Sequence, residues 1–282
     1  MRCDWESYVS ILPIWMREFI DKQGRASLLE LRLRIGAPPE LVTYKGSIWM
    51  QREVDKDDLL FCINAASHYS PWTAATLSQG FITAPGGHRL GICGAATVQN
   101  QKMVGIRTPT SICLRVARDI SGIASDLQSV NGSILIIGKP GSGKTTLLRD
   151  LIRQRSDKGA ESICVIDEKS ELFPMDAEGS FFQTGVRTDI LTGCSKADGI
   201  DAVLRNMGPA IIAVDEITAE SDCHALMHAG WCGVTLYATA HAIDKSDLIN
   251  RDIYRPLIAS GLFHTLVVLQ PDKSWRLERI KI

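Results

Sequence analysis

The stretch that decides the fold of this chain is Ser133-Ile-Leu-Ile-Ile-Gly-Lys-Pro-Gly-Ser-Gly-Lys-Thr-Thr146. Its opening run, Ile134 to Ile137, is continuously apolar, which is typical of a parallel strand covered on both faces. The pattern Gly-x4-Gly-Lys-Thr then begins at Gly138, and apolar residues follow with helical spacing from Leu147 to Ile152. A strand, a Gly-rich turn and a helix in this order predict a P-loop.

A P-loop binds phosphates through backbone N–H groups that glycines allow to turn inward, at a helix N-terminus that favours negative charge. We expect Lys144 to reach the β- and γ-phosphates and Thr145 to ligate Mg²⁺. The alternative is a Gly-rich turn that binds nothing. The expected nucleotide-binding residues are Gly138, Lys139, Pro140, Gly141, Ser142, Gly143, Lys144, Thr145 and Thr146.

A second apolar strand, within Pro209-Ala-Ile-Ile-Ala-Val-Asp-Glu216, ends in two carboxylates. Ligands of open α/β sheets bind at the carboxyl ends of the strands. We therefore expect Asp215 to hold Mg²⁺ through water. Glu216 is the expected catalytic residue that orients and polarises the attacking water. The alternative is a surface acidic pair that caps a loop.

Two further strand ends carry polar residues. Val165-Ile-Asp-Glu-Lys-Ser-Glu171 follows the P-loop helix directly, so we expect this strand beside the P-loop, with an acid orienting water or Mg²⁺. Gly233-Val-Thr-Leu-Tyr-Ala-Thr-Ala-His241 ends in a histidine that could sense the γ-phosphate. Solvated loop charges and a packing histidine are the respective alternatives. The candidate catalytic residues of these two strand ends are Asp167, Glu168, Glu171 and His241.

Composition limits the function classes. The chain has 282 residues, 45% hydrophobic, with 31 Lys and Arg against 32 Asp and Glu. This balance provides no basic footprint for nucleic acid or an anionic membrane. No apolar run approaches the roughly 20 residues of a membrane span, and the N-terminus lacks the apolar core of a signal peptide. We therefore expect a cytoplasmic protein that does not bind nucleic acid.

The eight cysteines show no CxxC spacing, so we expect free thiols rather than a disulfide framework. His224, His228 and Cys232 share one helix face by spacing, but a fourth ligand is not evident and a metal site is disfavoured.

We expect the chain to divide into an α+β N-terminal domain over residues 1–118, a linker over 119–132 and an α/β P-loop domain over 133–282. In the first, residues 5–20 predict a helix, the alternating Leu29–Ile35 a strand, and Asp55 to Asn64 a capped helix. Residues 80–84, 88–98, 103–107 and 111–117 predict further strands. In the second, strands alternate with helices, which is typical of an α/β fold. Strands are expected at 133–137, 162–166, 210–214, 233–238 and 264–269, with an edge strand at 275–282.

Taken in order, these strand ends resemble the ATPase superfamily of type II and type IV secretion systems. That superfamily carries four motifs in a fixed order. Its P-loop would be residues 138–145 and its acidic box residues 167–171. Its Walker B motif, which contains an essential Glu, would be residues 215–216, and its histidine box residue 241. Within that superfamily, the chain more specifically resembles the stage III sporulation AA family, whose members are ATPases of a sporulation channel in endospore-forming bacteria. It is carried by the sequences at 29–36, 88–94, 138–150, 167–172, 186–189 and 212–217.

This resemblance implies a RecA-like ATP- and Mg²⁺-dependent ATPase that works as a homo-hexameric ring. It implies that the N-terminal domain closes over ATP, and that an arginine from that domain or from a neighbouring subunit completes the site. Arg205 is the arginine that we expect to be catalytic. The other candidates are Arg89, Arg107, Arg115 and Arg187. The expected partners are integral membrane proteins of the sporulation channel, contacted peripherally from the mother-cell cytoplasm.

The chain departs from the superfamily pattern at two places. Ile217-Thr-Ala stands where Ile-Arg-Asp is usual, and Asp167-Glu-Lys stands where Glu-Asp-Pro is usual. An alternative function is a P-loop ATPase that acts on nucleic acid. A GTP switch is disfavoured because no Asn-Lys-x-Asp follows the P-loop, and a small-molecule kinase would not need the Asp-Glu pair.

Overall fold

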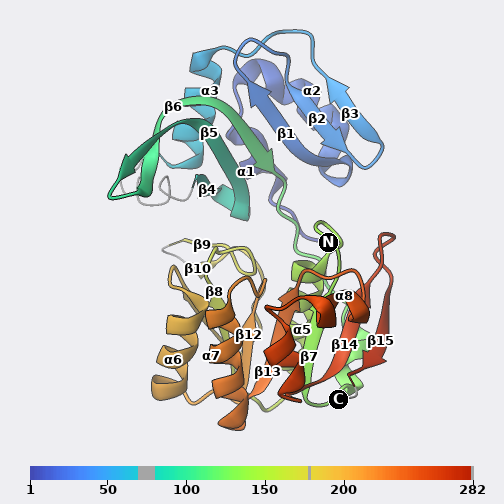
Figure 1. Cartoon of the computed structure of the whole chain (residues 1–282). Helices are drawn as coiled ribbons and strands as arrows, with labels where there is room; N and C mark the ends of the chain where they lie inside the picture. Colours follow the sequence, from blue (N-terminus) through green and yellow to red (C-terminus); the bar gives the residue numbers. More distant parts are fainter. Residues whose placement is uncertain (69–79, 177–178, 281–282) are drawn as a thin grey trace. The chain divides into compact units, whose positions relative to one another are not determined.

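The computed structural model describes residues 1–68, 80–176 and 179–280. Contacts divide the chain into two compact units, Met1–Asp119 and Ile120–Ile282, and each is described by itself (Figure 1). Over the described ranges, no helix has both the length and the apolar composition needed to cross a membrane.

The first unit is built on an antiparallel six-stranded sheet with the order β3-β2-β1-β6-β5-β4. The alternating segment forms β1, in which Leu31 and Leu33 are buried and Arg32 and Arg34 face away from the core. This alternation confirms the predicted half-buried strand. The strands are β1 (Leu28–Arg34), β2 (Glu40–Thr43), β3 (Gly46–Trp49), β4 (Phe81–Ala84), β5 (His88–Gln99) and β6 (Lys102–Arg115).

Among the described residues of this unit, the α-helices are α1 (Trp5–Ser10), α2 (Ile14–Ser27) and α3 (Lys56–Ala66). The prediction of one helix over residues 5–20 is wrong, because Pro13 lacks an N–H and begins a new helix as the N-cap of α2. The capped helix is confirmed. Asp55 and Asp58 accept hydrogen bonds from each other's backbone N–H groups and form a capping box at the start of α3.

The second unit is a seven-stranded sheet with the order β11-β8-β12-β13-β7-β14-β15, in which only β15 is antiparallel to its neighbour. The strands are β7 (Ser133–Ile137), β8 (Ile163–Asp167), β11 (Thr188–Thr192), β12 (Ile211–Val214), β13 (Thr235–Ala240), β14 (Phe263–Leu269) and β15 (Trp275–Arg279). The predicted edge strand at the C-terminus is present as β15; its last two predicted residues, 281 and 282, lie outside the described residues. A short ribbon of β9 (Met175–Asp176) and β10 (Gly179–Ser180) stands apart from this sheet.

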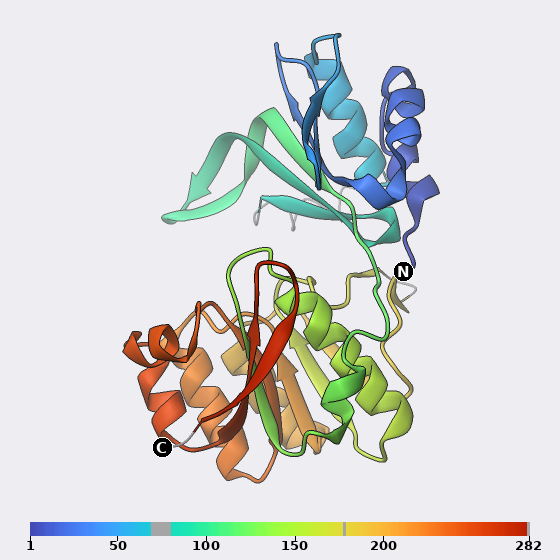
Figure 2. The ribbon, with the colours of Figure 1, turned by 90° about the vertical axis from the view of Figure 1, so that its right-hand side faces the viewer.

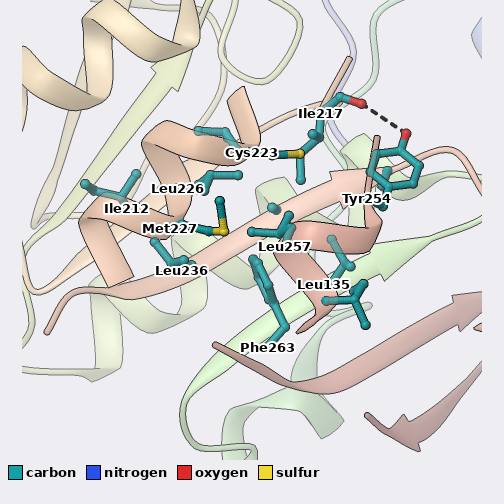
Figure 3. Packing of buried hydrophobic residues seen from close by; sticks show 14 of the residues in the cluster. Leu135, Ile212, Ile217, Cys223, Leu226, Met227, Leu236, Tyr254, Leu257 and Phe263 are labelled. Carbon is teal, nitrogen blue, oxygen red and sulfur yellow. Dashed lines mark hydrogen bonds between the residues drawn. The ribbon is translucent and has the colours of Figure 1, made fainter. Parts of the chain in front are cut away.

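Helices cover both faces of this sheet. Helix α5 (Lys144–Lys158) packs on one face, and α7 (Glu220–Trp231) lies on the other (Figure 2). Helix α6 (Lys196–Asn206) packs beside α7, and α8 (Lys245–Asn250) and α9 (Arg255–Ala259) follow β13. The core on the α7 face joins Leu226 and Met227 to Leu135, Ile212 and Leu236 of the strands (Figure 3).

The strand order corrects one expectation. Strand β8 follows α5 in sequence but does not lie beside the P-loop strand β7, because β12 and β13 come between them. Because β8 follows the P-loop helix in sequence, we expected it to lie beside β7. The chain instead crosses β13 and β12, and β8 pairs with β12 and β11. Strand β11, an edge strand that pairs with β8, was not predicted. Within the second unit, residues 125–129 form the short helix η3, which packs on α5.

Candidate functional site

The P-loop runs from the end of β7 to the first turn of α5. Gly138 lies close to its neighbours, since a Cβ there would lie 2.5 Å from the Ser142 hydroxyl and 3.0 Å from Leu269 Cβ, and a side chain would require them to shift. Gly143 has a φ of +103°, a backbone conformation that side chains disfavour. Lys139, Pro140 and Gly141 form the exposed turn, and Thr145 and Thr146 stand half-buried on the first turn of α5.

The ammonium of Lys144 is held by three acceptors. It donates to the carbonyls of Gly138 (2.9 Å) and Lys139 (3.0 Å) and to Nδ1 of His241 (3.0 Å). Because an ammonium has no lone pair, Nδ1 of His241 accepts and its Nε2 carries the proton. Burial lowers the pKa of Lys144, and the nearby charges of Asp215 and Glu216 oppose that shift.

Asp215 connects three elements at the edge of the sheet. The Thr145 hydroxyl on α5 donates to its Oδ2 (2.7 Å), and the Thr239 hydroxyl on β13 donates to its Oδ1 (2.6 Å). This carboxylate therefore lies beside the P-loop hydroxyl expected to ligate Mg²⁺. Hard oxygen donors of this kind are the ligands that Mg²⁺ prefers.

Glu216 is held in an unusual backbone conformation, with a φ of +52°. Its N–H donates to the Thr239 hydroxyl (2.8 Å). Its carboxylate receives the Nε2–H of His241 (3.0 Å) and pairs with the ammonium of Lys169 (3.3 Å). Burial raises the pKa of this carboxyl, but the charge and hydrogen bond of Lys169, together with the hydrogen bond from His241, outweigh burial and hold the pKa below its usual value.

The acids after β8 divide into two environments. Asp167 is buried, and its two oxygens accept from the backbone N–H groups of Glu171 (2.9 Å) and Phe173 (2.8 Å). Burial raises the pKa of Asp167 in spite of these hydrogen bonds. The carboxylate therefore closes the loop that carries Glu171. The same loop is held from α5, because Arg149 donates to the Glu171 carbonyl (2.8 Å) and to the Leu172 carbonyl.

Glu168 points to a buried lysine. Its Oε2 lies 2.6 Å from the ammonium of Lys196, which is the first residue of α6. Glu168 and Lys196 line a shallow depression together with Asp215 and Glu216, the two carboxylates that follow β12. Its lining residues are Asp167, Glu168, Lys169, Glu171, Lys196, Asp215 and Glu216.

The P-loop residues fit a phosphate group and a divalent cation. The Ser142 hydroxyl is buried, and over the described part of the chain it is among the few buried polar side-chain atoms that have no hydrogen-bond partner. It lies against Gly138, within the turn that is expected to bind phosphate. Lys144 supplies a cation on one side, and the Thr145–Asp215 pair supplies oxygen donors on the other.

The candidate arginines of the second unit have partners other than the P-loop and strand-end side chains described above. Arg205 is exposed in the last turn of α6 and pairs with Asp201, roughly 13 Å along the helix from Lys196. Arg187 donates to the Ser156 carbonyl, and Arg107 is exposed on β6. In the first unit, Arg115 pairs with Glu30 and Arg89 stacks on Phe81.

The structure gives no support for a metal site at His224, His228 and Cys232. The Cys232 thiol lies 4.0 Å from His228 Nε2. Within the described ranges, no three His, Cys, Asp or Glu side chains are grouped so that they could hold a metal ion.

Sequence reasoning missed three residues at this site: Arg149, Lys169 and Lys196. Lys169 stands inside the acidic motif at a position where the superfamily usually has Pro, so the departure itself was a signal. Lys196 follows a helix N-cap, Ser195, and nothing in its local pattern shows that its side chain turns inward. Its role becomes visible only when β8, α6 and α7 are placed together.

Comparison with known proteins assigns the family. The family model described as "Sporulation stage III, protein AA" matches residues 6–278. The chain belongs to the sporulation stage III protein AA family. A curated member, Stage III sporulation protein AA of Bacillus subtilis (strain 168), is 35% identical over 266 residues, covering 90% of this chain and 86% of that protein.

Solved structures show the same fold. The ATPase DotB of Legionella pneumophila aligns with a TM-score of 0.60 and 16% identity, covering 95% of this family member and 80% of that chain. The pilus retraction motor PilT, solved with bound ADP, also gives 0.60 and 16%, covering 94% and 83%. The predicted fold class is thereby confirmed: a P-loop NTPase domain of RecA-like type preceded by a smaller α+β N-terminal part.

Proposed function

We propose that this chain hydrolyses ATP with Mg²⁺ at the carboxyl edge of its parallel sheet. The observation that carries the proposal is one connected set of contacts across three elements. Lys144 and Thr145 on the P-loop helix contact His241 and Asp215, and His241 in turn contacts Glu216. Phosphate binding, cation binding and a carboxylate base are thereby within reach of one another.

Each residue has a role in this proposal. Lys144 exchanges its contact with His241 for oxygens of the β- and γ-phosphates, while the P-loop N–H groups donate to the phosphates. Thr145 and Asp215 hold Mg²⁺, which supplies positive charge against the phosphate oxygens when bound. A carboxylate oxygen of Glu216 accepts a proton from the attacking water. His241, placed between Lys144 and Glu216, senses whether the lysine is occupied by phosphate.

The acids after β8 have supporting roles in the same account. Asp167 shapes the loop, Glu168 anchors Lys196, and Glu171 faces the depression. Arg205 is exposed on α6. We propose that it completes the ATP site of a neighbouring subunit.

The wider role rests on the family. We propose that the chain forms a homo-hexameric ring, contacts integral membrane proteins of a sporulation channel from the mother-cell cytoplasm, and energises assembly of the channel or transport through it. The curated relative's name supports a role in sporulation, and the fold shared with DotB and PilT supports a motor. We also propose domains at residues 1–118 and 133–282 joined by residues 119–132.

The test is steady-state phosphate release from ATP by the purified full chain, with and without Mg²⁺. We expect turnover with Mg²⁺, and its loss together with weakened ATP binding in Lys144→Ala. The matched control is Lys22→Ala, since Lys22 is an exposed lysine paired with Glu18 in the first unit. Turnover that survives in Lys144→Ala would overturn the site assignment, and a wild-type chain that binds no nucleotide would overturn the proposed function.

A further inference from the structure

Lys196 is a buried lysine that the proposed mechanism does not use. It is 3% exposed and stands at the first position of α6. Its ammonium contacts Glu168 Oε2 at 2.6 Å and Asp222 Oδ2 at 3.6 Å. One cation therefore connects β8, α6 and the first turn of α7. Burial lowers the pKa of Lys196, but its hydrogen bonds and charge interactions with Glu168 and Asp222 outweigh burial and raise the pKa, so the ammonium stays protonated.

Asp222 shapes the segment that follows Glu216. Its Oδ2 accepts from the backbone N–H groups of Thr218 (3.0 Å) and Ala219 (3.2 Å) and from the Thr218 hydroxyl (3.4 Å). The same oxygen is the one that faces Lys196. The carboxylate thus folds residues 218 and 219 back onto the start of α7, with its charge balanced by the buried lysine.

The backbone of Glu216 needs such support. A non-glycine residue with positive φ, such as Glu216, is strained and persists only where its surroundings hold it. On one side, the Ile217 N–H donates to the Thr239 carbonyl (2.9 Å), and the Tyr254 hydroxyl donates to the Ile217 carbonyl (3.1 Å; Figure 3). On the other side, residues 218 and 219 are held by their hydrogen bonds to Asp222. Lys196 connects Asp222 to Glu168, which follows β8.

We propose that Lys196 is a positioning residue for Glu216. It fixes the turn after the proposed base by pairing with Asp222, and it aligns that turn with the strand end that carries Glu168. The inference rests on the proposed function, because it assigns Lys196 to the hydrolysis step. The P-loop contacts of Lys144 and Thr145 are made by other groups, so loss of the lysine is expected to affect turnover rather than ATP binding.

The alternative is a buried ion pair that only stabilises the fold. Such a pair would lower the melting temperature when broken but would leave the turnover of the folded molecules unchanged. A displaced base acts differently, because a shift of about 1 Å in a reacting group can cost roughly 100-fold in rate.

The experiment compares wild type, Lys196→Met, Lys196→Arg and the matched control Lys22→Met for kcat, KM and ATP dissociation constant. For Lys196→Met we expect kcat to fall on the order of 10- to 100-fold, with KM and the dissociation constant within about twofold of wild type. Lys196→Arg keeps the charge and should retain more turnover than Lys196→Met. Lys22→Met should match wild type.

Asp222→Asn provides a second route that does not depend on Lys196→Met folding well. It should show the same fall in kcat at constant KM, and the double variant should be little worse than the poorer single variant, because both changes act on one contact. Unchanged kcat in Lys196→Met or Asp222→Asn, or losses that multiply in the double variant, would overturn the inference while leaving the proposed function intact. A wild-type chain without turnover would instead overturn the proposed function.

Discussion

Glu216 depends on its two partners for its chemistry. His241 and Lys169 both contact its carboxylate, one from the end of β13 and one from the loop after β8. The charge and hydrogen bond of Lys169 and the hydrogen bond from His241 lower the pKa of Glu216 against the opposing effect of burial. The carboxylate is therefore ready to accept a proton at neutral pH, and its availability should depend on Lys169.

Replacing Lys169 by Met tests this dependence. Without the ammonium, the pKa of Glu216 rises, so a higher pH is needed to deprotonate the base. We expect the acid limb of the pH profile of kcat/KM to move to higher pH in Lys169→Met, measured by phosphate release from ATP. The shift should be modest, because both side chains are partly exposed and solvent screens the pair.

Lys22→Met is the control for the loss of one lysine charge, and its profile should overlay that of the wild type. An acid limb that stays in place or moves to lower pH in Lys169→Met would contradict the assigned role of the pair.

Sequence reasoning located the P-loop residues, Asp215, Glu216 and His241, since each follows an apolar strand, and the structure brings these side chains together. It did not anticipate that the carboxylate oxygens of Asp167 accept hydrogen bonds from the backbone N–H groups of Glu171 and Phe173, because these contacts depend on the conformation of the loop that follows β8. Lys169 and Lys196 were missed for a similar reason: their partners lie on other elements, and only tertiary packing brings them together.

At the scale of elements, a buried histidine joins parts of the first unit. His88, at the start of β5, accepts from the Ala117 N–H through Nδ1 (3.0 Å), and its Nε2 lies 2.7 Å from the Asp4 carbonyl. Because Nδ1 accepts, Nε2 carries the proton and the ring is neutral. It therefore ties the N-cap of α1 to the segment that follows β6. Burial lowers the pKa of His88, which keeps the ring neutral in the folded chain.

This arrangement predicts a loss of stability in acid. In the unfolded chain His88 takes up a proton below about pH 6.5, whereas the folded chain resists protonation until a lower pH. The free energy of unfolding contributed by His88 is thus fully present above that pH and declines as the pH falls towards the folded pKa. We expect the melting temperature to drop between pH 7.5 and 5.5, as followed by circular dichroism.

His88→Ala separates this effect from those of other histidines. The variant should melt below wild type at pH 7.5 but lose less additional stability at pH 5.5. An equal loss in both proteins would show that His88 is not the source of the pH dependence.

Elements with strong local signals were predicted, such as the alternating β1 and the capped α3. The β2–β3 hairpin was missed because β3, Gly46–Trp49, is mostly exposed and carries no alternation of apolar residues. The position of β8 was misjudged because strand order depends on long-range pairing with β12 and β11, which sequence adjacency does not encode.

For the whole molecule, the proposal of a ring predicts a change of mass with nucleotide. We expect the full chain with ATP and Mg²⁺ to reach six times the 31.0 kDa of one chain, measured by light scattering after size exclusion. Glu216→Gln should favour this state, because it retains ATP that the wild type would consume. A mass of one chain under all conditions would contradict a ring formed by the chain alone.

The central claim is that Glu216 activates water for ATP hydrolysis at this P-loop. The most direct measurement is the single-turnover rate of phosphate release in Glu216→Gln beside the wild type, with ATP affinity measured on the same samples. Glutamine keeps the shape of the side chain but cannot accept the proton as a base. We predict a rate lowered roughly 10²- to 10⁴-fold with ATP affinity nearly unchanged. A Glu216→Gln chain that releases phosphate at the wild-type rate would contradict the account.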